Sequence, residues 1–358
     1  MPVRKTTTTL ADGRELIYFD DDGSALDGHH EIDERHLDPR PETASMRQDV
    51  LTGDWITIAA ARQNRVFLPP ADQDPLAPQS AGNPSEVPGN YDVAVFENRS
   101  PSFGPVVGEL DTDGLALGRS LPSHGRCEVV CFDPATEGSI AQLPENRIRT
   151  VIEAWADRTA ALSAIPGIEQ VFPFENRGEQ IGVTLHHPHG QIYAYPFVTP
   201  RTQLLVDSVA AIPTLFADIL AFEQSSERIV LAGEHWTAFV PFAARWPIEV
   251  HLLPNRHVPD LAGLDEAERA ELAVLYRRLL RGIDALHDTP TPYIAAWHQA
   301  PVNEFRDEIR LMLQVTSPRR AAERLKFLAG SEAAMGAWVG DIVPERAAEN
   351  IREAIERG

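Results

Sequence analysis

Three polar side chains on alternate residues of one short run could carry out phosphoryl transfer. His187, His189 and Gln191 lie in the run His-Pro-His-Gly-Gln at positions 187–191, and apolar residues on both sides predict a strand. Because alternate residues of a strand point to one face, we expect these three side chains to share a face. Gly190 has no side chain, so we expect a ligand to approach the backbone there. An imidazole can attack phosphorus and an amide can donate to a non-bridging oxygen, so the run predicts a phosphoryl-transfer site.

The same run, preceded by Phe-Glu-Asn at 174–176, resembles the active-site signature of the galactose-1-phosphate uridylyltransferases, a branch of the histidine-triad superfamily. In that family the second histidine of the signature takes uridylyl from UDP-glucose as a covalent phosphoramidate and passes it to galactose 1-phosphate. The resemblance implies that His189 is the nucleophile, that Gln191 steadies the phosphoryl oxygens, and that His187 braces the strand. The alternative for the two histidines is a core or metal-binding pair.

Other signature residues and two earlier segments resemble the nucleotide site of that family. Asn176 and the backbone from Gly182 to Thr184 are expected to contact the phosphoryl group. A further set of residues is implied for the diphosphate and the uridine: Arg62, Arg65, Phe96 and Asn98. Two arginines three residues apart would supply planar donors, and the alternative is a solvated basic loop. Phenylalanine and asparagine would hold the base and ribose, and the alternative is a core ring followed by a turn residue.

The segment 324–332 resembles the part of the family that receives the hexose phosphate. Lys326 would meet the phosphate as a point charge, while Phe327 and Glu332 would face the sugar. Ser331 stands where the family has tyrosine, so the sequence leaves the sugar specificity open. The alternative for this segment is a solvated helix cap made by the lysine and the glutamate.

The metal ligands of the family are missing from this chain. Ala77, Ser80 and Thr136 occupy three of the four zinc positions, so only His187 remains there. At the second metal site of the family only His298 remains, and we expect it to be a hydrogen-bonded structural residue. We therefore expect an enzyme without metal or other cofactor.

Composition restricts the partners and the compartment. The 358 residues carry a formal net charge of −21, from 32 basic and 53 acidic side chains, which disfavours nucleic acid and anionic membranes as partners. An anionic substrate then needs a local basic pocket. No apolar run reaches the roughly 18 residues of a membrane span, and the N-terminus lacks the apolar stretch of a signal peptide, so we expect a cytoplasmic protein. Cys127 and Cys131 are expected to be buried, reduced thiols.

The order of the expected elements predicts an α+β fold with two similar halves. Residues 1–45 are expected to form an irregular acidic arm, His29 and His30 being a solvated loop pair. A unit of strand, strand, helix, strand, strand occurs once in residues 46–200 and again in residues 201–358. The resemblance implies that the two halves form one continuous antiparallel half-barrel sheet flanked by helices.

The resemblance implies UDP-glucose and galactose 1-phosphate as substrates and a homodimer as the assembly. Two other functions stay open at this point. A related nucleotidylyltransferase or phosphorylase, acting on another nucleotide sugar or a dinucleoside polyphosphate, would share His189 and differ in base or acceptor. A non-catalytic nucleotide-binding protein would keep the pocket without the reaction.

Overall fold

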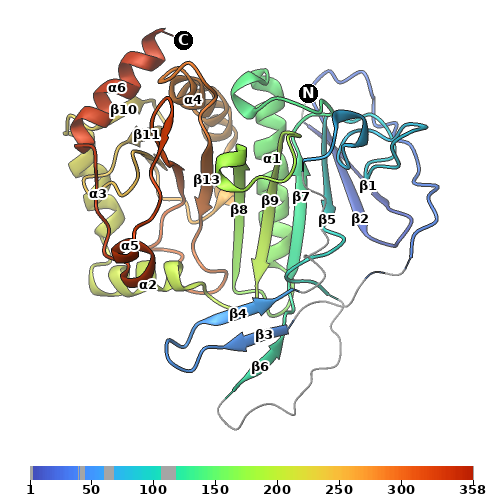
Figure 1. Cartoon of the computed structure of the whole chain (residues 1–358), viewed down its shortest axis with the longest axis horizontal. Coiled ribbons are helices and arrows are strands. Elements are labelled where there is room, and N and C mark those ends of the chain that lie inside the picture. Colours follow the sequence, from blue (N-terminus) through green and yellow to red (C-terminus); the bar gives the residue numbers. More distant parts are fainter. Residues whose placement is uncertain (1–2, 39, 41–44, 60–67, 106–117, 358) are drawn as a thin grey trace.

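A single large sheet runs through the computed structural model, which describes residues 3–38, 40, 45–59, 68–105 and 118–357. Its strands are β1 (Arg4–Thr9), β2 (Glu15–Asp20), β5 (Val93–Glu97), β7 (Arg126–Cys131), β8 (Gln170–Arg177), β9 (His189–Tyr195), β10 (Ile229–Ala232), β11 (Trp236–Phe239), β12 (Ile248–Pro254), β13 (Tyr293–His298) and β14 (Met312–Ser317). All neighbours pair antiparallel, in the order β1-β2-β5-β7-β9-β8-β13-β14-β12-β11-β10. The sheet is open, with β1 and β10 at its edges (Figure 1).

The two halves of the sheet repeat one pairing scheme. Read from the outer strands toward the junction, the order is β5-β7-β9-β8 in the first half and β11-β12-β14-β13 in the second half. The halves join where β8 pairs with β13, with Ala295 opposite Glu175. The predicted α+β fold and its continuous antiparallel sheet are therefore confirmed.

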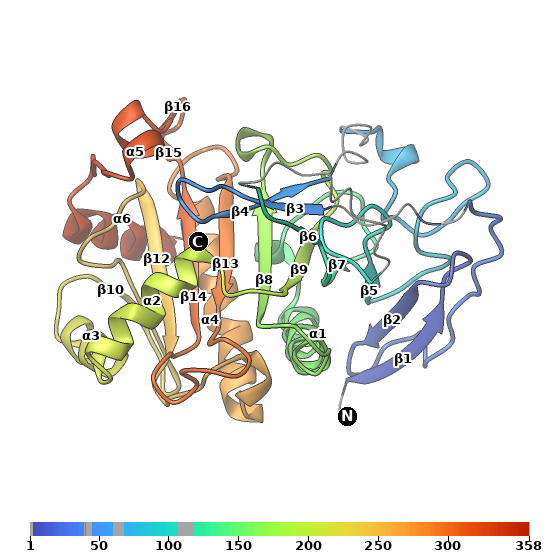
Figure 2. The same cartoon turned by 90° about the horizontal axis from the view of Figure 1, so that it is seen from below.

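Helices α1 (Glu145–Ser163) and α4 (Glu266–Asp284) cover one face of the sheet, side by side (Figure 2). Helix α4 begins at a capping box between Asp265 and Glu268. The apolar stripes of both helices pack on the strands around the fully buried rings of Trp155 and Trp297, whose centroids lie 5.9 Å apart. The helix α6 (Pro344–Arg357) packs on α4 and on β10.

The opposite face of the sheet is only partly covered. A small sheet of β3 (Ser45–Gln48), β4 (Trp55–Ile58) and β6 (Ser120–Pro122) lies over the later part of β9. There Met46 and Phe103 pack on Tyr193 and Tyr195 of β9. The beginning of β9 has no such cover, because Gln191 and His189 remain accessible beside clefts.

The first part of the N-terminal segment is ordered as strands, so the expectation of an irregular arm is wrong for residues 4–20, while residues 21–38 contain no helix or strand. Strands β1 and β2 form a hairpin that pairs with β5 and extends the main sheet. The apolar residues of β2 are buried, which explains why the segment orders as a strand despite its polar flanks. His30 is not solvated either: its ring stacks on Tyr18 at 3.7 Å and its Nε2 lies 3.1 Å from Asp20 Oδ1.

The remaining elements lie in the second half. Helices α2 (Pro200–Ala211) and α3 (Leu215–Gln224) precede β10, and α5 (Gly330–Met335) follows the short hairpin of β15 (Arg319–Ala321) and β16 (Arg324–Leu325). Among the described residues no single helix has the length and hydropathy to cross a membrane. Helices α2 and α3 reach the required length and hydropathy only when they are counted as one segment, and they are bent by 91° relative to each other.

Candidate functional site

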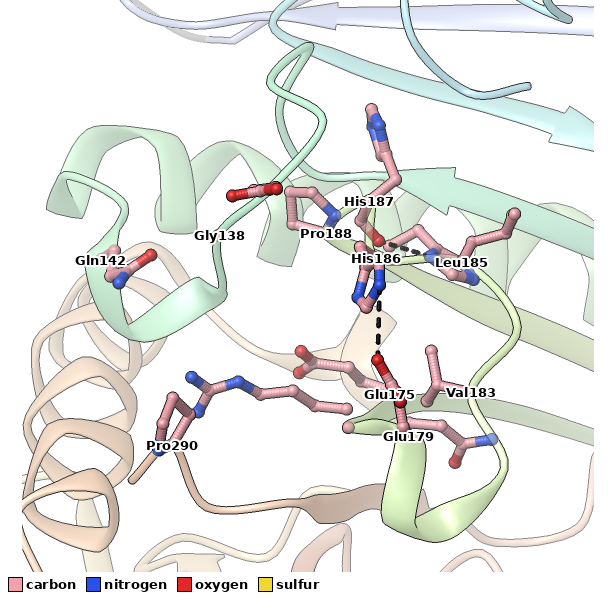
Figure 3. A pocket seen from close by; sticks show the side chains of 15 residues that line it. Gly138, Gln142, Glu175, Glu179, Val183, Leu185, His186, His187, Pro188 and Pro290 are labelled. Atoms are coloured by element: carbon pink, nitrogen blue, oxygen red, sulfur yellow. Dashed lines mark hydrogen bonds and ion pairs between the residues drawn. The ribbon is translucent and has the colours of Figure 1, made fainter. Parts of the chain in front are cut away.

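The signature run enters the sheet later than its sequence predicts. Gly178 takes a φ of +102° and a Cβ there would lie 2.7 Å from Pro292, so only glycine fits this turn. After one 3₁₀ turn at Glu179–Ile181 the chain is irregular, and β9 starts only at His189. His189 and Gln191 therefore alternate on the open face of the sheet, as predicted. The ring of His187 precedes the strand and turns away from the cavity, so the prediction of a shared face is wrong for this residue (Figure 3).

His189 is fixed in a form that leaves one ring nitrogen available. Its Nδ1–H donates to the backbone carbonyl of His187 at 2.7 Å, so Nε2 carries the lone pair. Burial lowers the pKa of His189 to about 4, although the bond to the carbonyl acts in the opposite direction. The imidazole is consequently neutral at physiological pH, the form in which it is a nucleophile.

Two clefts meet at His189. The larger has a volume of about 540 Å³, and its wall includes Asn176. Glu179, Val183 and His186 also line it (Figure 3). The smaller, about 230 Å³, has walls that include residues from the N-terminal hairpin, the loop before β5, and β9. A substrate whose reacting group lies at His189 can therefore extend in two directions, as a nucleotide joined to a second phosphorylated group would.

The smaller cleft brings together Phe96 and Asn98, which were predicted for the nucleoside, with Thr184 and Gln191, which were predicted for the phosphoryl group. The amide oxygen of Asn98 accepts from the backbone N–H of Ser100 at 3.0 Å, which orients the amide nitrogen as a donor. The expected roles of these residues remain predictions, and their grouping around one cavity is a finding.

Arg14 and Glu86 also line this smaller cleft, and sequence reasoning missed both. The buried guanidinium of Arg14 donates to Asp12, to the carboxylate of Glu86 and to the carbonyl of Glu97. It lies 6.0 Å from the centre of the Phe96 ring. No sequence motif identifies Arg14 as a cleft residue. It reaches the cleft only because the N-terminal hairpin pairs with β5 of the main sheet.

The larger cleft contains predicted and unpredicted side chains. Asn176 lines it as expected, and Arg177 beside it pairs with Asp284 through one guanidinium nitrogen at 2.6 and 2.8 Å. Glu175 is buried at its wall, where the hydroxyl of Tyr293 donates to it at 2.9 Å. Burial raises the pKa of Glu175 to about 7. Gly182 lies on the loop between the clefts, with a φ of +84°, and lines neither of them.

The expected reason for Gly190 is wrong. A Cβ at this residue would lie 2.7 Å from the ring of Phe132 and 3.0 Å from the carbonyl oxygen of Phe174. Gly190 is buried on the helix-covered face, so the missing side chain lets β9 pack closely inside the sheet. The clefts lie on the other face.

The residues predicted for the hexose phosphate are not lining residues of either cleft at His189 in this chain. Lys326 is 4% exposed, and its ammonium pairs with Glu332 at 2.8 Å and donates to the backbone carbonyls of Arg245 and Val339. The alternative of a solvated cap is wrong about solvation, because both side chains are buried, but Glu332 does cap α5 by accepting from the backbone N–H of Ala329 at 3.1 Å. Phe327 points outward and is 79% exposed. Arg62 and Arg65 lie outside the described residues.

The residues present do not fit the zinc of the family. Ala77, Ser80 and Thr136 offer no thiolate or imidazole, and both ring nitrogens of His187 already contact protein groups. The described part of the chain contains no group of three or more His, Cys, Asp or Glu that could hold a metal. His298 contacts the amide oxygen of Gln314 through Nε2 at 3.1 Å, which agrees with its predicted structural role.

Cys127 and Cys131 are buried and form no disulfide, as predicted.

Comparison with known proteins covers nearly the whole chain. The family model described as galactose-1-phosphate uridyl transferase, N-terminal domain, matches residues 40–199, and its C-terminal counterpart matches residues 194–357. A galactose-1-phosphate uridylyltransferase of Streptomyces lividans is 45% identical over 99% of each chain. One of Thermotoga maritima is 33% identical over 86% of this chain and 98% of its own.

Solved structures show the same likeness. A uridylyltransferase superposes with a TM-score of 0.79 at 29% identity, covering 87% of this chain and 99% of that one. An ADP-glucose phosphorylase from Arabidopsis thaliana superposes with a TM-score of 0.65 at 21% identity, covering 87% and 99% of the two chains, which shows a likeness of fold alone.

Proposed function

Because the chain belongs to the galactose-1-phosphate uridylyltransferase family, we propose that it transfers uridylyl from UDP-glucose to galactose 1-phosphate through a covalent intermediate on His189. One observation carries the proposal. The imidazole of His189 lies where the two clefts meet, neutral and with Nε2 available, because Nδ1 is bonded to the carbonyl of His187. A nucleotide sugar would place its uridine in the smaller cleft and its sugar phosphate in the larger one.

The reaction follows as two displacements at the same phosphorus. Nε2 of His189 attacks the phosphorus of the uridylyl group, the N–P bond forms, and the bond to the oxygen of glucose 1-phosphate breaks. A phosphate oxygen of galactose 1-phosphate then attacks the same phosphorus. The N–P bond breaks, UDP-galactose leaves, and His189 returns to its neutral form. Both leaving and attacking groups are phosphates of similar acidity, so the reaction needs no strong general acid.

Stabilising the charged oxygens during each displacement is the task of nearby donors. Gln191 and Asn176 line the clefts on either side of His189 and are proposed for this role. Arg62 and Arg65 are proposed for the diphosphate on the basis of their sequence, and planar guanidinium groups suit that role.

We propose that the enzyme works without a metal. Three of the four zinc positions hold residues that cannot ligate, and Asp74 and Tyr91 occupy the ring nitrogens of the fourth, His187. Incubation with a chelator followed by desalting is expected to leave the rate unchanged. Elemental analysis that finds stoichiometric zinc in the desalted, active protein would contradict the proposal.

Intact-mass measurement after mixing with UDP-glucose tests the function directly. We expect a gain of one uridylyl group on the wild type, no gain on His189→Ala, and removal of the group by galactose 1-phosphate. ADP-glucose should give a much smaller yield of adduct. A wild type without an adduct, or His189→Ala with one, would falsify the mechanism.

The cytoplasm is the proposed compartment, because both substrates are multiply charged phosphates that do not cross a bilayer unaided. The proposed assembly is a homodimer.

A further inference from the structure

The ring of His187 is held by two partners from a distant part of the chain. Nδ1–H of His187 donates to the Asp74 carboxylate at 2.7 Å, and Nε2 lies 2.9 Å from the hydroxyl of Tyr91. All three side chains are buried, with exposed fractions of 2%, 4% and 1%. The ring points away from the cavity, so it touches no substrate (Figure 3).

Both partners are themselves fixed by further bonds. The second carboxylate oxygen of Asp74 accepts from the backbone N–H of Leu76 at 2.9 Å, and its carbonyl accepts from the side chain of Asn83 at 2.7 Å. The hydroxyl of Tyr91 also lies 2.8 Å from the carbonyl of Leu76 and 3.1 Å from that of Asp133. Burial holds the pKa of Tyr91 well above its usual value, so the hydroxyl keeps its proton.

The backbone of His187 transmits this restraint to the nucleophile. Its carbonyl is the acceptor for Nδ1–H of His189 at 2.7 Å, so the place of that carbonyl sets both the tautomer and the direction of Nε2. Pro188, between the two histidines, restricts φ, and its own carbonyl accepts from the N–H of Phe132 at 3.0 Å. Few rotatable backbone bonds therefore lie between the fixed ring of His187 and the ring of His189.

We propose that Asp74 and Tyr91 are positioning residues for the covalent step: by locking the ring of His187 they hold its carbonyl where it orients His189 for attack on phosphorus. Neither residue contacts the reacting atoms. A misplacement of about 1 Å in such a group can cost up to about a hundredfold in rate, so the effect should fall on the chemical step and not on binding. This inference rests on the proposed function of His189.

The test measures the rate constant of uridylyl-His189 formation in a single turnover at saturating UDP-glucose, together with its dependence on UDP-glucose concentration. We expect Tyr91→Phe and Asp74→Asn to lower the rate constant about tenfold to a hundredfold. The concentration for half-maximal rate should change less than about threefold, because neither residue binds substrate.

Tyr18→Phe is the matched control. Tyr18 is a buried tyrosine of the same apolar cluster as Tyr91, and its hydroxyl has no hydrogen-bond partner among the described residues. It should keep the wild-type rate constant within about twofold, since no positioning bond is lost. All variants are assayed well below their unfolding temperatures, so that a lower stability does not reduce the folded fraction.

The outcomes separate the inference from the function. No adduct on the wild type overturns the proposed function. An adduct that forms at the wild-type rate in both variants overturns the positioning role alone. A loss in Tyr18→Phe as large as that in Tyr91→Phe, or a loss confined to the half-maximal concentration, also overturns it.

Discussion

At the scale of single residues, the chemistry of this protein depends on the state of one imidazole. His189 is a nucleophile only when neutral, and burial lowers its pKa from an ordinary value of 6.5 to about 4. The cavity that removes water from the ring therefore also keeps it free of a proton. The Nδ1–H group donates to a carbonyl and not directly to a carboxylate; the Asp74 carboxylate and the bond to the carbonyl both raise the pKa, but burial outweighs them.

The pH dependence of uridylylation follows from this pKa. As pH falls, neutral His189 is lost only near the folded pKa of about 4, so the rate of adduct formation should stay constant from pH 7 to about 5 and fall below that. Rapid-quench measurements between pH 4.5 and 8 check this, with circular dichroism confirming that the protein is folded at each pH. An acidic limb centred near 6.5 would show that the ring titrates as if it were exposed.

At the scale of elements, the N-terminal hairpin adds a wall to the smaller cleft. The family model begins at residue 40, whereas β1 and β2 precede it and place Arg14 against Phe96. The charge of Arg14 is matched by Asp12 and Glu86, so the wall is a buried ion cluster. Removing one member of such a cluster leaves unpaired charge, so this part of the pocket should be sensitive to small changes.

Arg14→Lys keeps the charge and removes the planar fork of donors. We expect a several-fold rise in the KM for UDP-glucose with little change in kcat, because the cleft wall loosens while His189 keeps its partners. The free energy of unfolding should fall by about 1–3 kcal/mol, from the lost buried hydrogen bonds. Steady-state kinetics and urea denaturation measure the two effects.

Arg4→Lys is the control in the same hairpin, because Arg4 pairs with Asp27 at the exposed surface, 2.7 Å away. It should change neither quantity measurably. A loss of stability in Arg14→Lys with an unchanged KM would mean that the hairpin supports the fold and takes no part in binding.

At the scale of the whole molecule, two halves with one pairing scheme have different tasks. The first half carries His189, the proposed nucleophile, at the start of β9. The corresponding strand of the second half is β14. There the side-chain amide of Gln314 donates to Glu249 at 2.7 Å, and its oxygen lies 3.1 Å from Nε2 of His298, so these polar side chains bond to one another. The two halves share one pairing scheme of strands, but only the first half carries the residues proposed for the reaction.

The segment predicted for the hexose phosphate supports the proposed homodimer. It lines neither cleft at His189 of its own chain, yet it presents apolar side chains to the outside, among them Phe327 and Met335 at 79% exposed each. A second copy would cover these side chains and could bring the segment to the partner's cleft.

We expect light scattering to give twice the mass of one chain, and Phe327→Ala to raise the KM for galactose 1-phosphate. At a galactose 1-phosphate concentration well below the KM of Phe327→Ala, mixed and refolded subunits of His189→Ala and Phe327→Ala should regain activity, because each heterodimer contains one complete site, about a quarter of all sites. Matched samples of each variant alone, refolded in the same way, are the controls. A monomeric mass would contradict the dimer, and no recovery on mixing would contradict a site shared between its two subunits.

Much of the architecture is readable from the sequence because it depends on local periodicity. The alternating strands, the apolar stripes of α1 and α4, and the capping box at Asp265 each arise from neighbours within a few residues, and all appear as predicted. The signature at 187–191 identified the family for a similar reason, since its five residues are consecutive and lie at the end of one loop and the start of one strand.

Only the tertiary structure showed which residues from distant parts of the sequence contact the site. Asp74 and Tyr91 are 113 and 96 residues away from His187, and Arg14 reaches the cleft through a hairpin that the sequence suggested was irregular. The face of the sheet on which Gly190 lies and the direction of the His187 ring also depend on where β9 begins. The packing of the preceding loop sets that starting point. The sequence by itself determined which groups could react; long-range packing determined which groups hold them, because such contacts leave no periodic trace in the order of the residues.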